Sequence, residues 1–215
     1  MLEDSYRHRG LRKSLIQTIK KKGIEDNRVL EAMMKVPRHF FFDQAFLEHA
    51  YEDKAFPIGE GQTISQPYTV AFQTCLLEIK PGDKILEIGT GSGYQASILM
   101  ELGAKVYTIE YNRELYEKTR KFLPMIGYFP DFHYGDGSQG LPLKAPFNGI
   151  LVTAGAPTVP EALIKQLAIN GKLVIPVGTR KSQKMLRLTK LEENKIKKEE
   201  FTNFSFVPLL GKHGW

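Results

Sequence analysis

Three acidic residues stand at the ends of short apolar runs in the middle of the chain, where open α/β sheets bind ligands. Glu87 precedes a glycine-rich turn by two residues, Glu110 ends the next apolar run, and Asp136 stands between two glycines. The carboxyl ends of parallel strands meet at one edge of a sheet, so carboxylates placed there are expected to surround one ligand. Glu110 lies 21 residues after Gly89, the first glycine of the turn. At that spacing a carboxylate accepts hydrogen bonds from both hydroxyls of a ribose.

The glycine turn, in ILEIGTGSGYQAS, follows a predicted strand and precedes a predicted helix. Gly89, Gly91 and Gly93 allow a tight turn, let a ligand approach the backbone, and leave free N–H groups at the start of the helix. A dinucleotide site would have a small residue in place of Tyr94, and the Glu87 carboxylate would repel a pyrophosphate. The turn therefore favours a nucleoside cofactor that is cationic or lacks phosphate.

The remaining acid completes a nucleoside site. Asp136 ends the third predicted strand, where it is placed to accept a hydrogen bond from an adenine amino group. An adenosine that carries a positive sulfonium satisfies all three acids, so we predict that the cofactor is S-adenosylmethionine. Simpler explanations remain open at two positions, since Glu110 can be a solvated acid at a strand end and GDG can be an ordinary turn.

A polar stretch ahead of the turn, GQTISQPYTVA (61–71), offers neutral hydroxyl and amide hydrogen-bond donors. Such donors suit a substrate whose carboxylate receives the methyl group of the cofactor. A carboxylate is ionised at neutral pH and needs no general base, which agrees with the lack of a histidine–acid pair in the sequence. Ser65 also has a structural alternative, as the N-terminal cap of a helix that begins near Pro67.

Two other kinds of methyl acceptor fit less well. The segment VTAGAP (152–157) lacks the Asn/Asp-Pro-Pro-aromatic stretch that is common in enzymes acting on the amino groups of bases. Chemistry at cytosine C5 needs a nucleophilic thiol, and Cys75 lies in an apolar stretch, where a buried core cysteine is expected.

The elements that position these residues alternate between strand and helix. Short β-rich runs are separated by helix-length segments, which predicts a parallel sheet covered by helices on both faces. These runs are 84–89, 105–110, 149–154 and 172–178, and two later runs, 185–192 and 201–209, predict an antiparallel hairpin at the sheet edge. We expect one α/β domain, 1–215, with a helical N-terminal addition (1–55), a cofactor-binding core (80–180) and C-terminal edge strands (184–215).

Composition and charge restrict the remaining classes of function. The chain has 215 residues, 42% of them hydrophobic and 25% charged, as in an ordinary soluble domain. The single cysteine fits a reducing compartment, and without an apolar run of membrane-spanning length we expect a cytoplasmic protein with no membrane partner. The net charge of +6 comes with lysine clusters at 20–22 and 195–198, which we interpret as solvated helix ends and a charged hairpin rather than a nucleic-acid site. The five histidines show no metal-ligand spacing, so no metal is expected.

Several of these segments together resemble the protein-L-isoaspartate O-methyltransferase family, over nearly the whole chain. The similar segments include GIEDNRVLEAMMKVPRHFF (23–41), AYEDKAFPIGEGQTISQPYTVA (50–71), the glycine turn, DGSQGLPLKAPFNGILVTAGAP (136–157), GKLVIPVG (171–178) and FVPLLGKHGW (206–215). The resemblance implies a doubly wound, mostly parallel, Rossmann-like methyltransferase sheet with extra N-terminal helices. It also implies methyl transfer from S-adenosylmethionine to the α-carboxyl of L-isoaspartyl residues in damaged proteins and peptides, which initiates their repair through a succinimide. A monomer is expected.

The resemblance also assigns site residues by position. Ser65 matches the family's active-site serine in the TIS motif, Thr63 and Ile64 flank it against cofactor and substrate, and Val207 matches a strand whose backbone pairs with the substrate peptide. The cofactor set that it implies is Thr63, Ile64, Glu87, Gly89, Gly91, Gly93, Glu110, Asp136 and Gly137, and the substrate set is Thr63, Ser65 and Val207. Some members have histidines after the TIS motif where this chain has Tyr68 and Val70, so a histidine role there does not apply.

Two other functions stay open from the sequence. The first is a methyltransferase of another specificity, for a small carboxylic acid or a nucleic acid. The second is a non-catalytic module that binds an adenosyl ligand.

Overall fold

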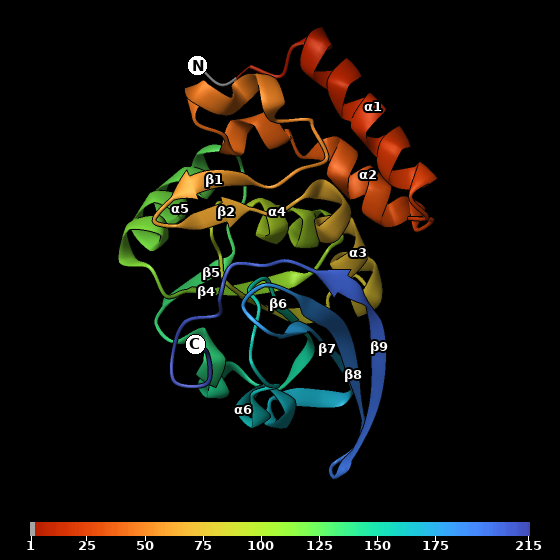
Figure 1. The fold of residues 1–215 in the computed structure, drawn as a ribbon, viewed down its shortest axis with the longest axis vertical. Coiled ribbons are helices and arrows are strands. Elements are labelled where there is room, and N and C mark those ends of the chain that lie inside the picture. The colour runs from red at the N-terminus through yellow and green to blue at the C-terminus, as the bar shows by residue number, and fades with distance from the viewer. Residues whose placement is uncertain (1–2) are drawn as a thin grey trace.

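The computed structural model describes residues 3–215. Seven strands between residues 84 and 204 form one sheet (Figure 1). The strand order is β5-β4-β3-β6-β7-β8-β9, in which β3 to β7 run parallel and β8 and β9 run antiparallel to their neighbours. The strands are β3 (Lys84–Ile88), β4 (Lys105–Glu110), β5 (Asp131–Tyr134), β6 (Phe147–Val152), β7 (Leu167–Gly178), β8 (Gln183–Glu192) and β9 (Lys195–Phe204). The predicted fold class, with its antiparallel C-terminal hairpin, is confirmed.

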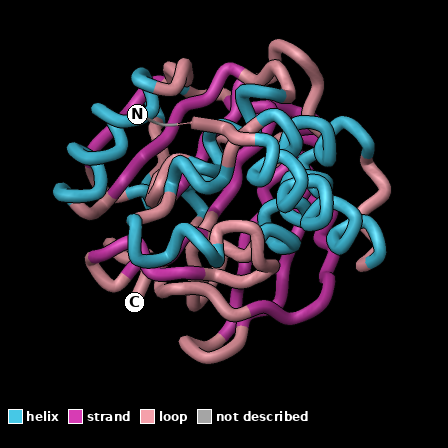
Figure 2. The backbone as a smooth tube through the Cα atoms, turned by 90° about the horizontal axis from the view of Figure 1, so that it is seen from above, coloured by secondary structure: helices cyan, strands magenta, loops and turns pink. Residues whose placement is uncertain are grey.

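Helices cover both faces of this sheet, as the turned view shows (Figure 2). One core contains Ile85 and the inner sides of α1 (Tyr6–Lys21), α2 (Asn27–Lys35), α3 (Pro67–Leu77), α4 (Tyr94–Glu101) and α5 (Arg113–Met125). The other core contains Leu86 and Leu163, and it is covered by α6 (Glu161–Lys165). Adjacent residues of β3 thus point to opposite cores, which explains why Ile85 and Leu86 are both apolar instead of alternating with polar residues.

The N-terminal residues form helices whose ends carry recognisable capping residues. Helix α1 ends at Lys21, and Gly23 follows with φ +96°, a conformation that suits glycine. Asp26 caps α2 by accepting a hydrogen bond from the Arg28 N–H. Two short 3₁₀ turns follow, η1 (Arg38–Phe41) and η2 (Gln44–His49), and two more lie later, η3 (Gly137–Gln139) and η4 (Pro142–Lys144). No helix among the described residues is long and apolar enough to cross a lipid bilayer.

Two features of the strands differ from the sequence predictions. A small antiparallel hairpin, β1 (Phe56–Gly59) and β2 (Gln62–Ile64), leads into the polar stretch 61–71, where no strand was predicted. The last strand ends at Phe204, not at residue 209. Beyond it the chain leaves the sheet edge because Gly155 donates to the Val207 carbonyl and accepts from the Leu209 N–H, and these bonds direct the C-terminal segment back across the sheet (Figure 1).

Candidate active site

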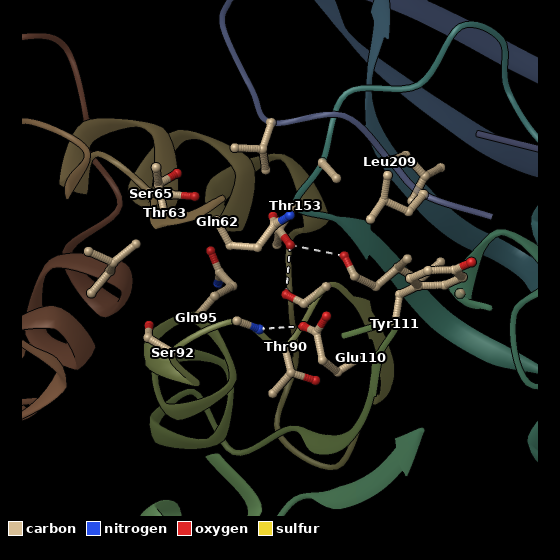
Figure 3. A pocket seen from close by; sticks show the side chains of 18 of the residues that line it. Gln62, Thr63, Ser65, Thr90, Ser92, Gln95, Glu110, Tyr111, Thr153 and Leu209 are labelled. Atoms are coloured by element: carbon tan, nitrogen blue, oxygen red, sulfur yellow. Dashed lines mark hydrogen bonds between the residues drawn. The ribbon is translucent and has the colours of Figure 1, made fainter. Parts of the chain in front are cut away.

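A cavity lies at the carboxyl ends of the central strands, between the glycine turn, β2 and the C-terminal segment (Figure 3). It is lined mainly by residues 62–65, 88–92 and 207–210, together with Tyr94, Gln95, Ile109, Glu110, Tyr111, Gly137, Thr153 and Ala154. Among these described lining residues, Glu110 is the only one with a charged side chain. A cavity that offers one carboxylate and no cationic side chain suits a positively charged ligand with hydroxyl groups better than a phosphate.

The glycine turn needs glycine for two reasons, the positive φ of its backbone and the close approach of neighbouring side chains. Gly89 has φ +96°, and a Cβ there would lie 2.5 Å from the Thr153 hydroxyl oxygen. That hydroxyl donates to the carbonyls of Ile88 and Gly89, at 2.9 and 2.8 Å, and so ties the end of β3 to the end of β6 (Figure 3). Gly93, with φ +84°, lies against the Leu123 side chain, which would be 2.8 Å from an added Cβ. Larger residues at either position would displace the turn from the ligand.

Glu110 lies in the cavity with its carboxylate already oriented by the backbone. Its Oε2 accepts from the Gly91 N–H at 2.8 Å (Figure 3). Its Oε1 accepts from the Asn112 N–H, also at 2.8 Å. The residue is only 6% exposed. Each carboxylate oxygen retains further accepting capacity, so the pair of oxygens can accept two hydroxyl groups of a ligand while holding the turn in place.

Glu87 does not line the cavity, in contrast to the expectation from its spacing. It is fully buried within β3, and its Oε2 accepts from the Thr108 hydroxyl at 2.5 Å, while the Thr108 and Thr90 hydroxyls are 2.6 Å apart. Burial raises the pKa of Glu87 to about 8, and the nearby Glu110 charge adds to the effect of burial. A neutral carboxyl group behind the turn supports Thr90 through Thr108, and it places no negative charge in the cavity.

Asp136 also lies outside the cavity lining, although the adjacent Gly137 is part of it. The Asp136 carboxylate accepts from the N–H and the hydroxyl of Ser138 and from the Lys212 N–H, at 2.7–2.9 Å. Burial opposes ionisation here, but the bonds from Lys212 and Ser138 outweigh it and hold the pKa of Asp136 below its usual value. The carboxylate therefore fixes the C-terminal segment beside the cavity instead of pointing into it.

Thr63, Ile64 and Ser65 lie together at one end of the cavity, on the side of α3 (Figure 3). Ser65 does not cap α3. The N-cap position is Gln66, without a side-chain capping bond, and the Asp53 carboxylate accepts from the Tyr68 N–H at 2.8 Å instead. The prediction that Ser65 caps α3 is thus wrong. Within residues 3–215 the Ser65 hydroxyl forms no hydrogen bond, and only the Ser65 carbonyl is bound, by Arg38.

An open groove continues from the Ser65 end of the cavity toward the end of β9. Cavity and groove share Thr63, Ser65, Thr153 and Val207. The groove is otherwise lined by Gln66, Tyr68, Thr69, Lys181, Ser182 and residues 202–206. The carbonyl of Val207 accepts from Gly155, whereas its N–H has no hydrogen-bond partner among the described residues. Backbone groups left unpaired beside a groove can bind an extended peptide.

The structure brings together most, but not all, of the predicted site residues. Thr63, Ile64, Ser65, Gly89, Gly91, Glu110, Gly137 and Val207 all line the cavity, whereas Glu87, Gly93 and Asp136 do not. Sequence reasoning missed Gln62, Gln95, Tyr111 and Thr153, which also line it. Tyr111 directly follows Glu110, and Thr153 follows β6, so their positions at strand ends were a usable signal. Gln95 lies in α4 and had no such signal.

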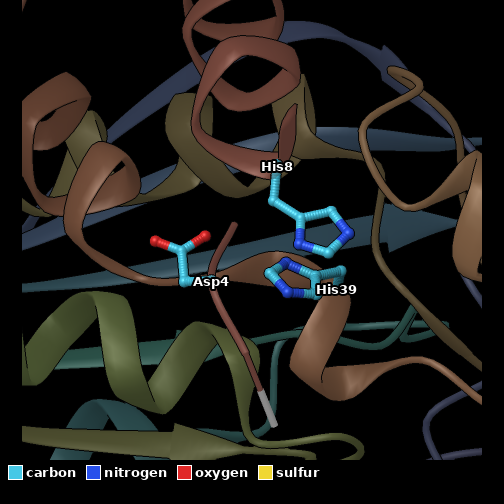
Figure 4. A group of neighbouring side chains, drawn as sticks. All are labelled: Asp4, His8 and His39. Atoms are coloured by element: carbon cyan, nitrogen blue, oxygen red, sulfur yellow. The ribbon is translucent and has the colours of Figure 1, made fainter. Parts of the chain in front are cut away.

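A second cluster of titratable side chains, Asp4, His8 and His39, lies in the N-terminal layer (Figure 4). The His8 and His39 rings stack with centroids 3.8 Å apart, and the Asp4 carboxylate binds Arg12 at 2.8 Å. Both ring nitrogens of His39 already have partners, the Tyr51 hydroxyl at 2.7 Å and a backbone carbonyl at 3.1 Å. A metal ion would have to displace these bonds, so we interpret the cluster as a hydrogen-bonded junction between the chain's first residues and η1.

Comparison with known proteins decides the family. The model of the family described as protein-L-isoaspartate(D-aspartate) O-methyltransferase matches residues 10–214. The chain belongs to this family. A member from Cytophaga hutchinsonii named protein-L-isoaspartate O-methyltransferase is 61% identical over 214 residues, covering 100% of this chain and 97% of that protein. A member of the same name from Christiangramia forsetii is 56% identical and covers 97% of this chain and 98% of that protein.

Solved structures of the family share the fold. One named protein-L-isoaspartate O-methyltransferase superposes with a TM-score of 0.82 at 27% identity, over 94% of this chain. The present chain spans 66% of that longer one. A Plasmodium falciparum protein described as a beta-aspartate methyltransferase, in complex with S-adenosyl-L-homocysteine, superposes with a TM-score of 0.78 at 27% identity, over 93% of this chain and 98% of that one. The Rossmann-like methyltransferase fold is therefore that of the family.

Proposed function

We propose that the protein transfers the methyl group of S-adenosylmethionine to the α-carboxyl of L-isoaspartyl residues in damaged proteins and peptides. The observation that carries this proposal is the free hydroxyl of Ser65, which lies where the cofactor cavity meets the open groove. The family relatives named for this reaction, at 61% and 56% identity, support the same conclusion.

The residues of the cavity fit S-adenosylmethionine in charge and in donor set. The Glu110 carboxylate would accept the ribose hydroxyls, and the glycine turn lets the ligand contact the backbone. No phosphate-binding cation lines the described part of the cavity, which agrees with a cofactor that carries a positive sulfonium. When bound, this cofactor supplies an activated methyl group on that sulfur.

The protein's own contribution is to hold and orient the acceptor. The acceptor is already a carboxylate at neutral pH, so no residue has to remove a proton from it. The Ser65 hydroxyl would donate one hydrogen bond to this carboxylate, with Thr63 beside it in the same wall. A neutral hydroxyl orients the oxygen without lowering its nucleophilicity as strongly as a cation would. The groove, with the unpaired Val207 N–H, would hold the peptide on either side of the isoaspartyl residue.

A pair of matched peptides tests this function. Incubation with radiolabelled S-adenosylmethionine should yield a base-labile methyl ester on a peptide that contains isoaspartate, and none on the same sequence with aspartate. Equal labelling of both peptides, or of a small carboxylic acid instead, would indicate a methyltransferase of another specificity. Cofactor binding without any ester would indicate a binding module.

We further propose that the protein acts as a cytoplasmic monomer and does not bind nucleic acid. The lysines of the C-terminal hairpin support the last point because they are paired with acids of the same hairpin. Lys195 lies 3.3 Å from Glu192, Lys197 3.1 Å from Glu199, and Lys198 2.8 Å from Glu200. Mass determination by light scattering and a filter-binding assay with single-stranded RNA test these statements.

A further inference from the structure

Arg38 carries a charged side chain that is completely buried in the N-terminal layer. It is 0% exposed, at the start of η1. Within residues 3–215 no carboxylate forms an ion pair with it, and its Nη1 has no hydrogen-bond partner. Burial lowers the pKa of Arg38 to about 10, so the group stays charged at neutral pH. A buried charge without a directly paired carboxylate is costly, which calls for a reason why an arginine stands here.

The partners of Arg38 are backbone carbonyls and aromatic rings. Its Nη2 donates to the Ser65 carbonyl at 2.9 Å, and its Nε donates to the Ala50 carbonyl at 3.1 Å. Its guanidinium carbon lies 4.7 Å from the centre of the Tyr94 ring. Tyr94 is the first residue of α4, directly after the glycine turn, and it lines the cofactor cavity. One side chain therefore contacts both the acceptor loop and the helix that begins at the cofactor turn.

The Arg38 side chain holds the Ser65 carbonyl, and no hydrogen bond of the Ser65 side chain among the described residues adds to this contact. Ser65 is not a helix cap, and its hydroxyl has no partner among the described residues. The planar guanidinium presents donors in fixed directions, so it can fix two carbonyls and stack on a ring at once. A lysine ammonium has the same charge but neither the planar fork nor the stacking face.

We propose that Arg38 is a positioning residue for methyl transfer, which holds the Ser65 carbonyl and thereby sets the Ser65 hydroxyl relative to the cofactor. The inference rests on the proposed contact between Ser65 and the acceptor carboxylate. Methyl transfer needs the acceptor oxygen in line with the methyl group, and a misplacement of ~1 Å can cost on the order of 100-fold in rate.

A double-mutant cycle with Ser65 distinguishes positioning from a general effect on the fold. The variants are Arg38→Lys, Ser65→Ala and the double variant, and the measured quantity is the single-turnover rate on an isoaspartyl peptide at saturating cofactor. Arg38→Lys should lower this rate about 10-fold in the wild-type background and less than about 2-fold in the Ser65→Ala background, because interacting residues are not additive. The dissociation constant of S-adenosylhomocysteine should change less than about 3-fold, since the proposed role concerns the acceptor.

The matched control is Arg12→Lys, another buried guanidinium of the same N-terminal layer. Arg12 is 5% exposed and binds Asp4 and Tyr51 rather than the Ser65 loop. This control should lower the melting temperature as Arg38→Lys does but leave the single-turnover rate of the folded protein unchanged. If Arg38→Lys does not fold, Arg38→Gln, which keeps an amide donor without the buried charge, replaces it in both backgrounds.

Three results would overturn the inference. The first is a wild-type rate in the folded Arg38 variant, and the second is an equal rate loss in both Ser65 backgrounds. The third is a wild-type rate in Ser65→Ala itself, because Arg38 would then have nothing to position there. Failure of the proposed function is a separate result, since the wild-type protein would then form no base-labile ester on the isoaspartyl peptide.

Discussion

Removal of the Glu110 carboxylate should weaken cofactor binding much more than it changes the rate of methyl transfer. Both of its oxygens accept a backbone N–H at 2.8 Å, from Gly91 and Asn112, which holds the carboxylate in the cavity wall. In Glu110→Ala, the ribose would lose two hydrogen bonds to a charged group, for a net cost of about 2–4 kcal/mol. That free energy corresponds to a dissociation constant raised roughly 30- to 700-fold.

The same geometry makes glutamine a poor substitute for Glu110. Because each carboxylate oxygen accepts a backbone N–H, the amide nitrogen of Glu110→Gln must face one of the two donors, either Gly91 or Asn112. A donor that faces a donor leaves both without an acceptor, at a cost of about 1–3 kcal/mol, so the glutamine side chain is expected to turn away from its place in the cavity wall and no longer meet the ribose. Glu110→Gln should therefore weaken binding nearly as much as Glu110→Ala.

The assay is calorimetric titration with S-adenosylhomocysteine, which lacks the methyl group and so cannot turn over. Glu114→Ala is the matched control because it removes one nearby negative charge from an exposed position outside the cavity. Its dissociation constant should stay within about 2-fold of wild type, since exposed charges are screened by water and salt. An unchanged dissociation constant in Glu110→Ala would refute the assignment of this residue to the ribose.

Three further outcomes follow from the site. Ser65→Ala should lower the single-turnover rate roughly 10- to 100-fold, as expected for one lost hydrogen bond to a charged group. Its affinity for S-adenosylhomocysteine should be nearly unchanged, and near-wild-type turnover would exclude the proposed contact. The single-turnover rate should be nearly flat from about pH 6 to 8, because no general base is needed; a steep rise that fits one ionisation would contradict this. The melting temperature of Glu87→Gln should rise relative to that of the wild type as pH rises from about 5 to 8. A difference in melting temperature that stays constant over this pH range would show that Glu87 does not titrate as described.

The sign of the Glu87 effect follows from proton linkage. The folded-state pKa of about 8 lies above the unfolded value, so the folded protein retains a proton that the unfolded chain loses. Unfolding then releases a proton, and the stability of the wild type falls with rising pH between the two pKa values. Glutamine cannot titrate, so the stability difference between variant and wild type should grow over this window and level off above it.

The sheet and the glycine turn were predictable from sequence because their signals are local. Apolar runs such as Lys105–Glu110 mark strands that are buried on both faces, and the glycines directly follow such a run. The position of Glu87 outside the cavity lining has a physical reason that the sequence also offers. A residue inside a strand covered on both faces points into a core whichever way it faces, so the cavity is reached mainly at the last positions of strands and beyond them. Glu87 lies within β3, whereas Thr90 follows its end.

The state of Ser65 could not be predicted, because it depends on residues that the sequence separates from it. A serine two positions before Pro67 indicates a helix cap on local evidence. That interpretation fails because α3 begins at Pro67 with Gln66 as its N-cap residue, and because the Asp53 carboxylate accepts from the Tyr68 N–H. The Ser65 carbonyl is held by Arg38, 27 residues earlier in the chain. These two long-range contacts leave the hydroxyl free while fixing its backbone. Through Arg38, the N-terminal layer thus takes part in shaping the acceptor end of the site, and a change at Arg38 should affect methyl transfer rather than cofactor binding.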